Sequence, residues 1–179
     1  MVNKEFIALC SKAWGIQILA YIYKGHDARV TPISHHFSTG RTSISSALDH
    51  LLVLGYIKKN AGHGHPLRPA FLLTKKGKKV ARWAVSIDEV LVPNDWTIAR
   101  KSWALPILRQ SIPVRRFGEL RAELKPVTDR ALSETLKRLS ECQWVHRQVD
   151  TKSSPPGVSY KPYGTGKILI PSLKESLIL

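Results

Sequence analysis

The sequence predicts a mainly α-helical protein with small β wings, an α+β architecture of two winged helix-turn-helix domains in tandem. Three observations support this prediction. The two halves of the 179-residue chain share landmarks in the same order. Each half contains apolar residues at helical spacing followed by two short strand patterns. The length is sufficient for two small domains, each with its own core.

An internal repeat with an offset of 88 to 89 residues organises the chain. Segment 12–19 matches segment 101–108 and shares Lys, Trp and the closing Ile-Leu pair. Further correspondences are Ile44/Leu132, Leu48/Leu136, Leu51/Leu139, Ile57/Val145, Phe71/Tyr160, Thr74/Tyr163 and Gly77/Gly166. The repeat predicts two duplicated domains, residues 1–92 and 93–179, with the boundary at the irregular stretch that follows Leu91.

The first half is expected to contain three helices, a two-stranded wing and a final helix. Helices are predicted at 14–23, 33–37 and 42–54, and strands at 56–59 and 70–74, around a wing at 60–69. In the third helix Ile44, Leu48 and Leu51 recur at i, i+4 and i+7, so one face is buried. Thr31 and Pro32 are expected to be the N-cap and first-turn residue of the second helix, and Gly55 to end the third.

The second half repeats this order. Helices are predicted at 103–110, 116–123 and 128–140, and strands at 144–149 and 158–161, around a wing at 152–157. Leu132, Leu136 and Leu139 form the buried stripe of the third helix. Asn94 or Asp95 is expected to cap the first helix of this half. Trp14 and Trp103, which open the repeats, are expected to be core anchors because large aromatic side chains bury the most area.

The chain is strongly basic, with 28 Lys and Arg against 13 Asp and Glu, a net charge of +15 and a pI of about 10.1. Residues 1–92 contribute +8 (13 basic, 5 acidic) and residues 93–179 contribute +7 (15 basic, 8 acidic). Such an excess attracts polyanions, above all nucleic acid. The even division predicts that both halves contact the polyanion; the alternative is a generally basic, solvated surface.

Other classes of function are disfavoured. Cys10 and Cys142 supply neither a disulfide framework nor a zinc set, and no cysteine or carboxylate stands at ligand spacing around His35, His36, His63 and His65. The GTGK run at 164–167 lacks two residues of a phosphate-binding loop. We therefore expect no enzyme, cofactor or metal. The absence of a signal-peptide pattern and of a long apolar run predicts a cytoplasmic protein without a membrane partner.

The outward faces of the two third helices are the candidate base-reading surfaces. In a helix-turn-helix, the second of the two helices, here the third helix of each half, enters the major groove. Side chains near its N-terminus reach base edges, while flanking cations contact phosphates. Arg41, Arg130 and Arg138 lead because a guanidinium can donate twice to guanine. The other candidates on helices and strands are Thr42, Ser45, Ser46, Lys58, Arg115, Arg116, Thr128, Ser133 and Lys137. In the wings, a narrow minor groove would accept His63, His65 and Arg68, with Lys152 as the basic residue of the second wing.

Several strings permit comparison with a known family. They are KSW at 101–103, PIL at 106–108, RRFGELR at 115–121, LS at 132–133 and LKRL at 136–139. Through these strings, residues 100–170 resemble the HxlR branch of winged-helix transcription factors. The first half is similar to the wider MarR-like group through RTSIS at 41–45, LGYI at 54–57 and LTKKG at 73–77. The resemblance implies winged helices that bind DNA, usually with one domain per chain and two chains per complex.

The chain also departs from that family. Two domains appear in series, and Pro162-Tyr163 stands where the family tends to have Leu-Thr. Some relatives sense oxidants with a cysteine ahead of the Trp-containing helix; Cys10 lies four residues before Trp14, and nothing comparable precedes Trp103. We therefore do not transfer that activity to this chain.

These observations predict a bacterial-type, sequence-specific double-stranded DNA-binding transcriptional regulator, a repressor that acts on the nucleoid. A plasmid or phage replication or partition protein is one alternative, and an antitoxin-like protein-interaction module is another. The chain has two candidate DNA-reading heads, meaning the third helix of each half with its wing. Two such heads in one chain predict an intrachain pseudo-dimer. The C-terminal stripe of Leu169, Leu173 and Leu177 predicts either packing on its own domain or a homodimer through the terminal helices.

Overall fold

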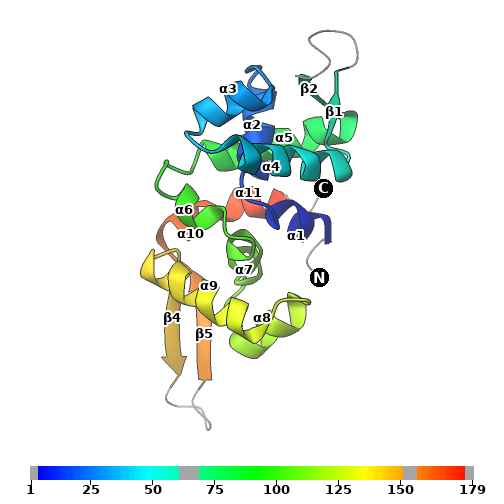
Figure 1. The fold of residues 1–179 in the computed structure, drawn as a ribbon. Coiled ribbons are helices and arrows are strands. Elements are labelled where there is room, and N and C mark those ends of the chain that lie inside the picture. Colours follow the sequence, from blue (N-terminus) through cyan, green and yellow to red (C-terminus); the bar gives the residue numbers. More distant parts are fainter. Residues whose placement is uncertain (1–3, 61–68, 151–156, 176–179) are drawn as a thin grey trace. The chain divides into compact units, whose positions relative to one another are not determined.

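The computed structural model describes residues 4–60, 69–150 and 157–175 and divides the chain into two compact units (Figure 1). The N-unit comprises residues 12–89. The C-unit comprises the second half from residue 90 onward together with the first eleven residues. The described residues are mainly helical, with two small antiparallel sheets, which is consistent with a winged-helix fold.

The N-unit contains three helices, a two-stranded hairpin and a long final helix. In chain order these elements are α2 (Gly15–Tyr23), α3 (Val30–His36), α4 (Arg41–Val53), β1 (Ile57–Lys59), β2 (Phe71–Leu73) and α5 (Lys75–Asp88). The strands pair with Lys58 opposite Leu72. Helix α5 packs along α2, and both bury their apolar faces in the core of the unit.

The C-unit has the same order of elements with four additions. Its elements are α1 (Lys4–Cys10), α6 (Trp96–Ala99), α7 (Ala104–Gln110), β3 (Arg115–Arg116), α8 (Phe117–Glu123), α9 (Asp129–Glu141), β4 (Val145–Asp150), β5 (Gly157–Pro162), α10 (Gly164–Ile168) and α11 (Ile170–Glu175). The additions are α1, α6, β3 and α11. Its antiparallel sheet has the order β3-β5-β4.

Helix α1 is a feature that the sequence did not predict. Phe6 and Leu9 are buried, and the helix contacts α7 of the C-unit. The predicted domains placed residues 1–92 together, whereas the contacts group these first residues with the second half. An apolar helix face needs cover from some other element, and sequence periodicity does not reveal which element supplies it.

Two predictions about helix starts and tryptophans are wrong. Helix α3 begins at Val30 with Arg29 at the N-cap, so Thr31 is not the N-cap, whereas Pro32, the third residue, lies in the first turn as expected. Proline is tolerated there because first-turn amides have no partner within the helix. Trp14 and Trp103 are only half-buried, because they lie at the N-caps of α2 and α7 rather than on the inner faces of these helices.

The caps and the C-terminal segment also differ in part from expectation. Asp95 occupies the N-cap of the unpredicted helix α6, but its carboxylate accepts from the Val92 amide at 3.3 Å, so it does not cap the helix.

The C-terminal stripe falls in two short helices, because Pro171 lacks the amide hydrogen that a continuous helix needs. Leu169 and Leu173 are fully buried. The third member, Leu177, lies outside the described residues.

No single helix among the described residues is long and apolar enough to cross a bilayer.

Candidate nucleic-acid interface

The first two turns of α4 bring together four of the predicted contact residues. Gly40 precedes the helix in an extended conformation, and no side chain caps it. Ile44, Leu48 and Leu51 are buried with at most 1% exposed surface, which fixes the rotation of the helix. The predicted contact residues therefore lie on or beside the outer face: Arg41, Thr42 and Ser46 are exposed, and Ser45 is half-buried. Arg41 has no carboxylate partner among the described residues.

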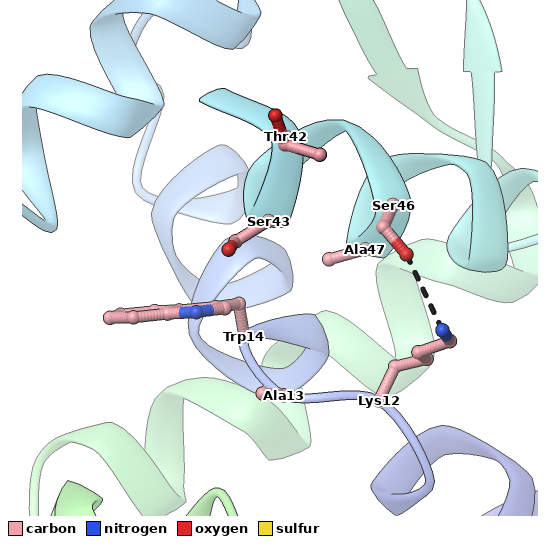
Figure 2. Close-up of a pocket in the computed structure, with 7 residues that line it drawn as sticks. All are labelled: Lys12, Ala13, Trp14, Thr42, Ser43, Ser46 and Ala47. Carbon is pink, nitrogen blue, oxygen red and sulfur yellow. Dashed lines mark hydrogen bonds between the residues drawn. The ribbon is translucent and has the colours of Figure 1, made fainter. Parts of the chain in front are cut away.

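A shallow pocket of about 330 Å³ lies along one side of this helix (Figure 2). The residues that line it are Lys12, Ala13, Trp14, Thr42, Ser43, Ser46 and Ala47. Figure 2 shows Lys12 reaching α4, where its Nζ donates a hydrogen bond to Ser46 Oγ at 3.4 Å. Sequence reasoning missed Lys12 because it lies outside the helix-turn-helix segment, 34 residues from Ser46. It adds a cation beside the N-terminal half of α4.

Helix α9 presents a different outer face, crossed by ion pairs. Thr128 is its N-cap, and its Oγ1 accepts from the Ala131 amide at 3.2 Å. Arg130 Nε lies 2.8 Å from Glu134 Oε1, and Lys137 Nζ lies 3.9 Å from Glu141 Oε1. Both pairs have i, i+4 spacing, which places their members on one stripe. This stripe contains two of the predicted contact residues, each beside a carboxylate.

The neighbours of Glu134 lower the pKa of its carboxyl group. The hydrogen bond from Arg130 and the charge of that guanidinium lower the pKa of the Glu134 carboxyl, and Arg138 lowers it further. The carboxylate is therefore charged at neutral pH. An ionised carboxylate can accept a hydrogen bond from cytosine N4, so this face carries an acceptor as well as donors. Ser133 and Arg138 are exposed beside it.

Arg115 and Arg116 contact their own unit. Arg115 is half-buried, with its Nε 3.5 Å from Glu123 Oε1. The backbone amide of Arg116 donates to Glu119 Oε2 at 2.7 Å. The guanidinium of Arg116 lies beside Gly157, where an added Cβ would stand 3.3 Å from Cζ. These contacts hold β3, the start of α8 and strand β5 together.

The wing candidates fall mainly outside the described residues. That is the case for His63, His65, Arg68 and Lys152. Lys58 is exposed on β1 of the first wing. In the second wing Arg147 is exposed on β4, opposite Tyr160 of β5. Sequence reasoning passed over Arg147, although its position in a basic strand beside the wing could have identified it.

A second pocket lies at the turn of the C-unit helix-turn-helix. It has a volume of about 440 Å³ and is lined by Gly118, Arg121, Ala122, Lys125 and Val127. Lys125 is exposed, and Arg121 Nε is 2.5 Å from Asp129 Oδ1 at the start of α9. Exposed cations beside the second helix of a helix-turn-helix suit phosphate contacts. Among the described residues no group of three or more His, Cys, Asp or Glu could hold a metal ion.

Comparison with known proteins finds a family match in the second half. Residues 98–177 match the family of HxlR-like helix-turn-helix proteins. The match covers a little under half of the chain and includes α7, α8, α9 and the second wing. It agrees with the resemblance inferred from the strings at 101–139. No curated protein matches the chain.

Several solved structures are similar to about half of the chain. A protein described as a MarR-family transcriptional regulator from Porphyromonas gingivalis is 24% identical over 47% of this chain and 82% of its own, with a TM-score of 0.43. The reduced transcriptional regulator YodB of Bacillus subtilis is 24% identical over 49% and 89%, with a TM-score of 0.43. A protein described as a MarR-family regulator from Enterococcus faecalis is 26% identical over 51% and 79%, with a TM-score of 0.42.

Proposed function

We propose that the protein is a sequence-specific double-stranded DNA-binding transcriptional regulator that acts as a repressor. The observation that carries the proposal is the helix-turn-helix family match of residues 98–177 within a chain of net charge +15. A basic protein can place the exposed second helix of a helix-turn-helix, here α9, in the major groove. The proposal assigns no catalytic step to the chain, and it places the protein on the nucleoid.

We further propose that the two units are tandem winged helix-turn-helix domains. The supporting observation is that corresponding elements start at a nearly constant offset. Helices α2 and α7 differ by 89 residues, α4 and α9 by 88, and α5 and α10 by 89. Strand β3, which precedes α8, also has a counterpart in the N-unit. There Ala28 O accepts a hydrogen bond from the Phe71 amide of β2 at 3.0 Å, just as Arg115, 87 residues after Ala28, pairs with β5.

The two reading heads would select different half-sites. The outer face of α4 offers one guanidinium, Arg41, with hydroxyl groups beside it, whereas that of α9 offers paired Arg130 and Glu134. Because their donors and acceptors differ, one chain would bind an asymmetric pair of half-sites as an intrachain pseudo-dimer. A homodimer through the terminal helices stays a prediction. Leu169 and Leu173 do not support it, since both are buried within their own unit.

The proposal is tested by measuring binding of the full chain to duplexes enriched from a random library. Arg41→Ala and Arg138→Ala are each expected to weaken binding to the enriched duplex by about 1 to 3 kcal/mol, the usual value of a base-edge contact. Lys174→Ala is the control, because Lys174 is exposed on α11, outside both reading heads. A wild-type chain that binds no duplex, or enriches no sequence, contradicts the proposal.

A further inference from the structure

Helix α5 of the N-unit carries a dense and one-sided set of cations that the base-reading surfaces do not include. Lys75, Lys78, Lys79 and Arg82 are all exposed and recur at i, i+3, i+4 and i+7. They therefore lie on one stripe of the helix, called here the α5 stripe. The opposite face, which includes Val80, is buried against the core.

The helix gains nothing locally from this arrangement. Like charges at i, i+3 and i, i+4 repel one another. Cations in the first turn are also unfavourable, because the helix dipole places positive charge at the N-terminus. No acidic residue stands between Asp49 and Asp88, and Asp88 is paired with Lys24 at 2.6 Å. Arg82 Nε donates to Tyr23 Oη at 3.4 Å, but the lysines of the stripe have no carboxylate partner among the described residues. A local rule broken in this way indicates a functional surface.

The fold does not require these cations. In the C-unit the corresponding segment, α10 and α11, carries only two lysines, Lys167 and Lys174, and one acid, Glu175. Both segments follow the second wing strand and are held in the same way, by a buried glycine packed on a backbone carbonyl. The α5 stripe is therefore a property of this one helix.

Lys76, which neighbours the stripe in sequence, has a different role. Its Nζ donates to Leu54 O at 3.4 Å and lies 4.8 Å from the centre of the Tyr56 ring. These contacts place the start of α5 at the C-terminal end of α4. The proposed base-reading residues lie toward the opposite end of α4, with Arg41 about 20 Å and Ser46 about 12 Å from Leu54 at 1.5 Å per residue. The stripe is thus separate from the base-reading end.

We propose that the α5 stripe binds the phosphate backbone of duplex DNA without sequence preference, as a second contact surface of the N-unit. The stripe spans seven residue steps, or about 10 Å, which corresponds to about three phosphates along one strand. A row of exposed Lys and Arg side chains along one helix suits the evenly spaced phosphates of a nucleic-acid strand rather than a single base edge. This inference rests on the proposed function, since it assumes duplex binding by the same chain.

The test compares two triple variants of the full chain that have equal net charge. The stripe variant is Lys75→Gln, Lys78→Gln, Lys79→Gln. The control variant, Lys4→Gln, Lys167→Gln, Lys174→Gln, removes three exposed helical lysines of the C-unit. The stripe variant is expected to unfold at the same or a higher temperature than the wild type, because it removes repulsive neighbours. This check separates a loss of binding from a loss of fold.

The readout is the slope of log K against log salt for a random-sequence duplex. Each lost phosphate contact removes about 0.9 from that slope, so the stripe variant should lose about 2.7 while the control keeps the wild-type slope. The preference for an enriched over a random duplex should stay unchanged. Equal slopes for the two triple variants overturn the inference but leave the proposed function intact.

Two further outcomes would also overturn it. If the wild-type chain binds no duplex at all, the inference and the proposed function fail together. Vesicles of phosphatidylserine and phosphatidylcholine provide the second probe. If the stripe variant loses vesicle binding but keeps the wild-type salt slope on duplex DNA, the stripe is a membrane-facing surface and not a phosphate-backbone contact.

Discussion

Gly77 packs directly on the backbone of Tyr56: a Cβ built at position 77 would stand 1.7 Å from the Tyr56 carbonyl oxygen. The same relationship recurs in the C-unit, where a Cβ at Gly166 would stand 2.0 Å from Trp144 O. In each unit this carbonyl also accepts an amide hydrogen bond, from Thr74 at 3.0 Å or from Tyr163 at 2.8 Å. The end of each wing is thereby fixed to the helix that follows it.

This packing predicts that Gly77→Ala destabilises the protein. The added methyl group meets backbone that cannot rotate away, so we expect the free energy of unfolding to fall by at least about 1 to 3 kcal/mol. Gly118→Ala is the matched control, because Gly118 lies on a helix with nothing within 4 Å of the added Cβ. It should leave stability unchanged or raise it by up to about 1 kcal/mol. Chemical denaturation that ranks the two variants equally would contradict this packing.

The ends of α4 and α9 give a second prediction. Gly55 and Gln143 occupy corresponding positions after α4 and α9, with φ values of 71° and 58°. Glycine adopts this conformation readily, whereas other residues are strained by about 1 to 2 kcal/mol. We therefore expect Gln143→Gly to stabilise the protein and Gly55→Gln to destabilise it. Thermal unfolding of the two variants tests the opposite signs, and equal signs would contradict the assigned backbone conformations.

Much of this architecture could be predicted from the sequence because its signals are local. The leucine stripe at Leu132, Leu136 and Leu139 identified α9, and Gly55 identified the end of α4. The i, i+4 spacing of Arg130 and Glu134 is also a local signal, since it places a carboxylate beside a leading contact residue.

The remaining features depend on contacts that are distant in sequence. The position of α1 against α7 joins residues about a hundred positions apart, and apolar periodicity does not identify such a partner. The roles of Arg115 and Arg116 within their own unit depend on how β3 meets α8 and β5. Thr31 was assigned to the N-cap of α3, which Arg29 occupies, because threonine favours this position and arginine has no capping side chain.

The two cysteines should differ sharply in reactivity. Burial raises the pKa of the Cys10 thiol above its ordinary range, and Arg109 offsets this only in part. Because the thiolate is the nucleophile, a thiol whose pKa is raised stays protonated and unreactive at pH 8. Cys142 is exposed. We expect one rapidly reacting thiol with a disulfide reagent in the native protein and two after unfolding. Two fast thiols in the native state would contradict the burial of Cys10.

The pair Arg130 and Glu134 predicts a titration shift. The hydrogen bond from Arg130 lowers the pKa of the Glu134 carboxyl, so the folded state holds its proton less tightly than the unfolded state. The pair therefore favours folding at neutral pH, and this contribution is lost as the pH falls through the lowered pKa. NMR titration should show the Glu134 pKa rising in Arg130→Gln. An unchanged pKa in that variant would mean that the pair does not form in solution.

The central claim, that one chain carries two DNA-reading heads, is tested most directly by footprinting an enriched duplex together with a mass measurement of the complex. The prediction is that one chain protects two patches with different sequences, centred about one helical turn, roughly 10 base pairs, or a multiple of it apart. Arg41→Ala should remove protection of one patch and Arg138→Ala that of the other. One chain that protects a single short half-site, lost equally in both variants, would contradict the claim.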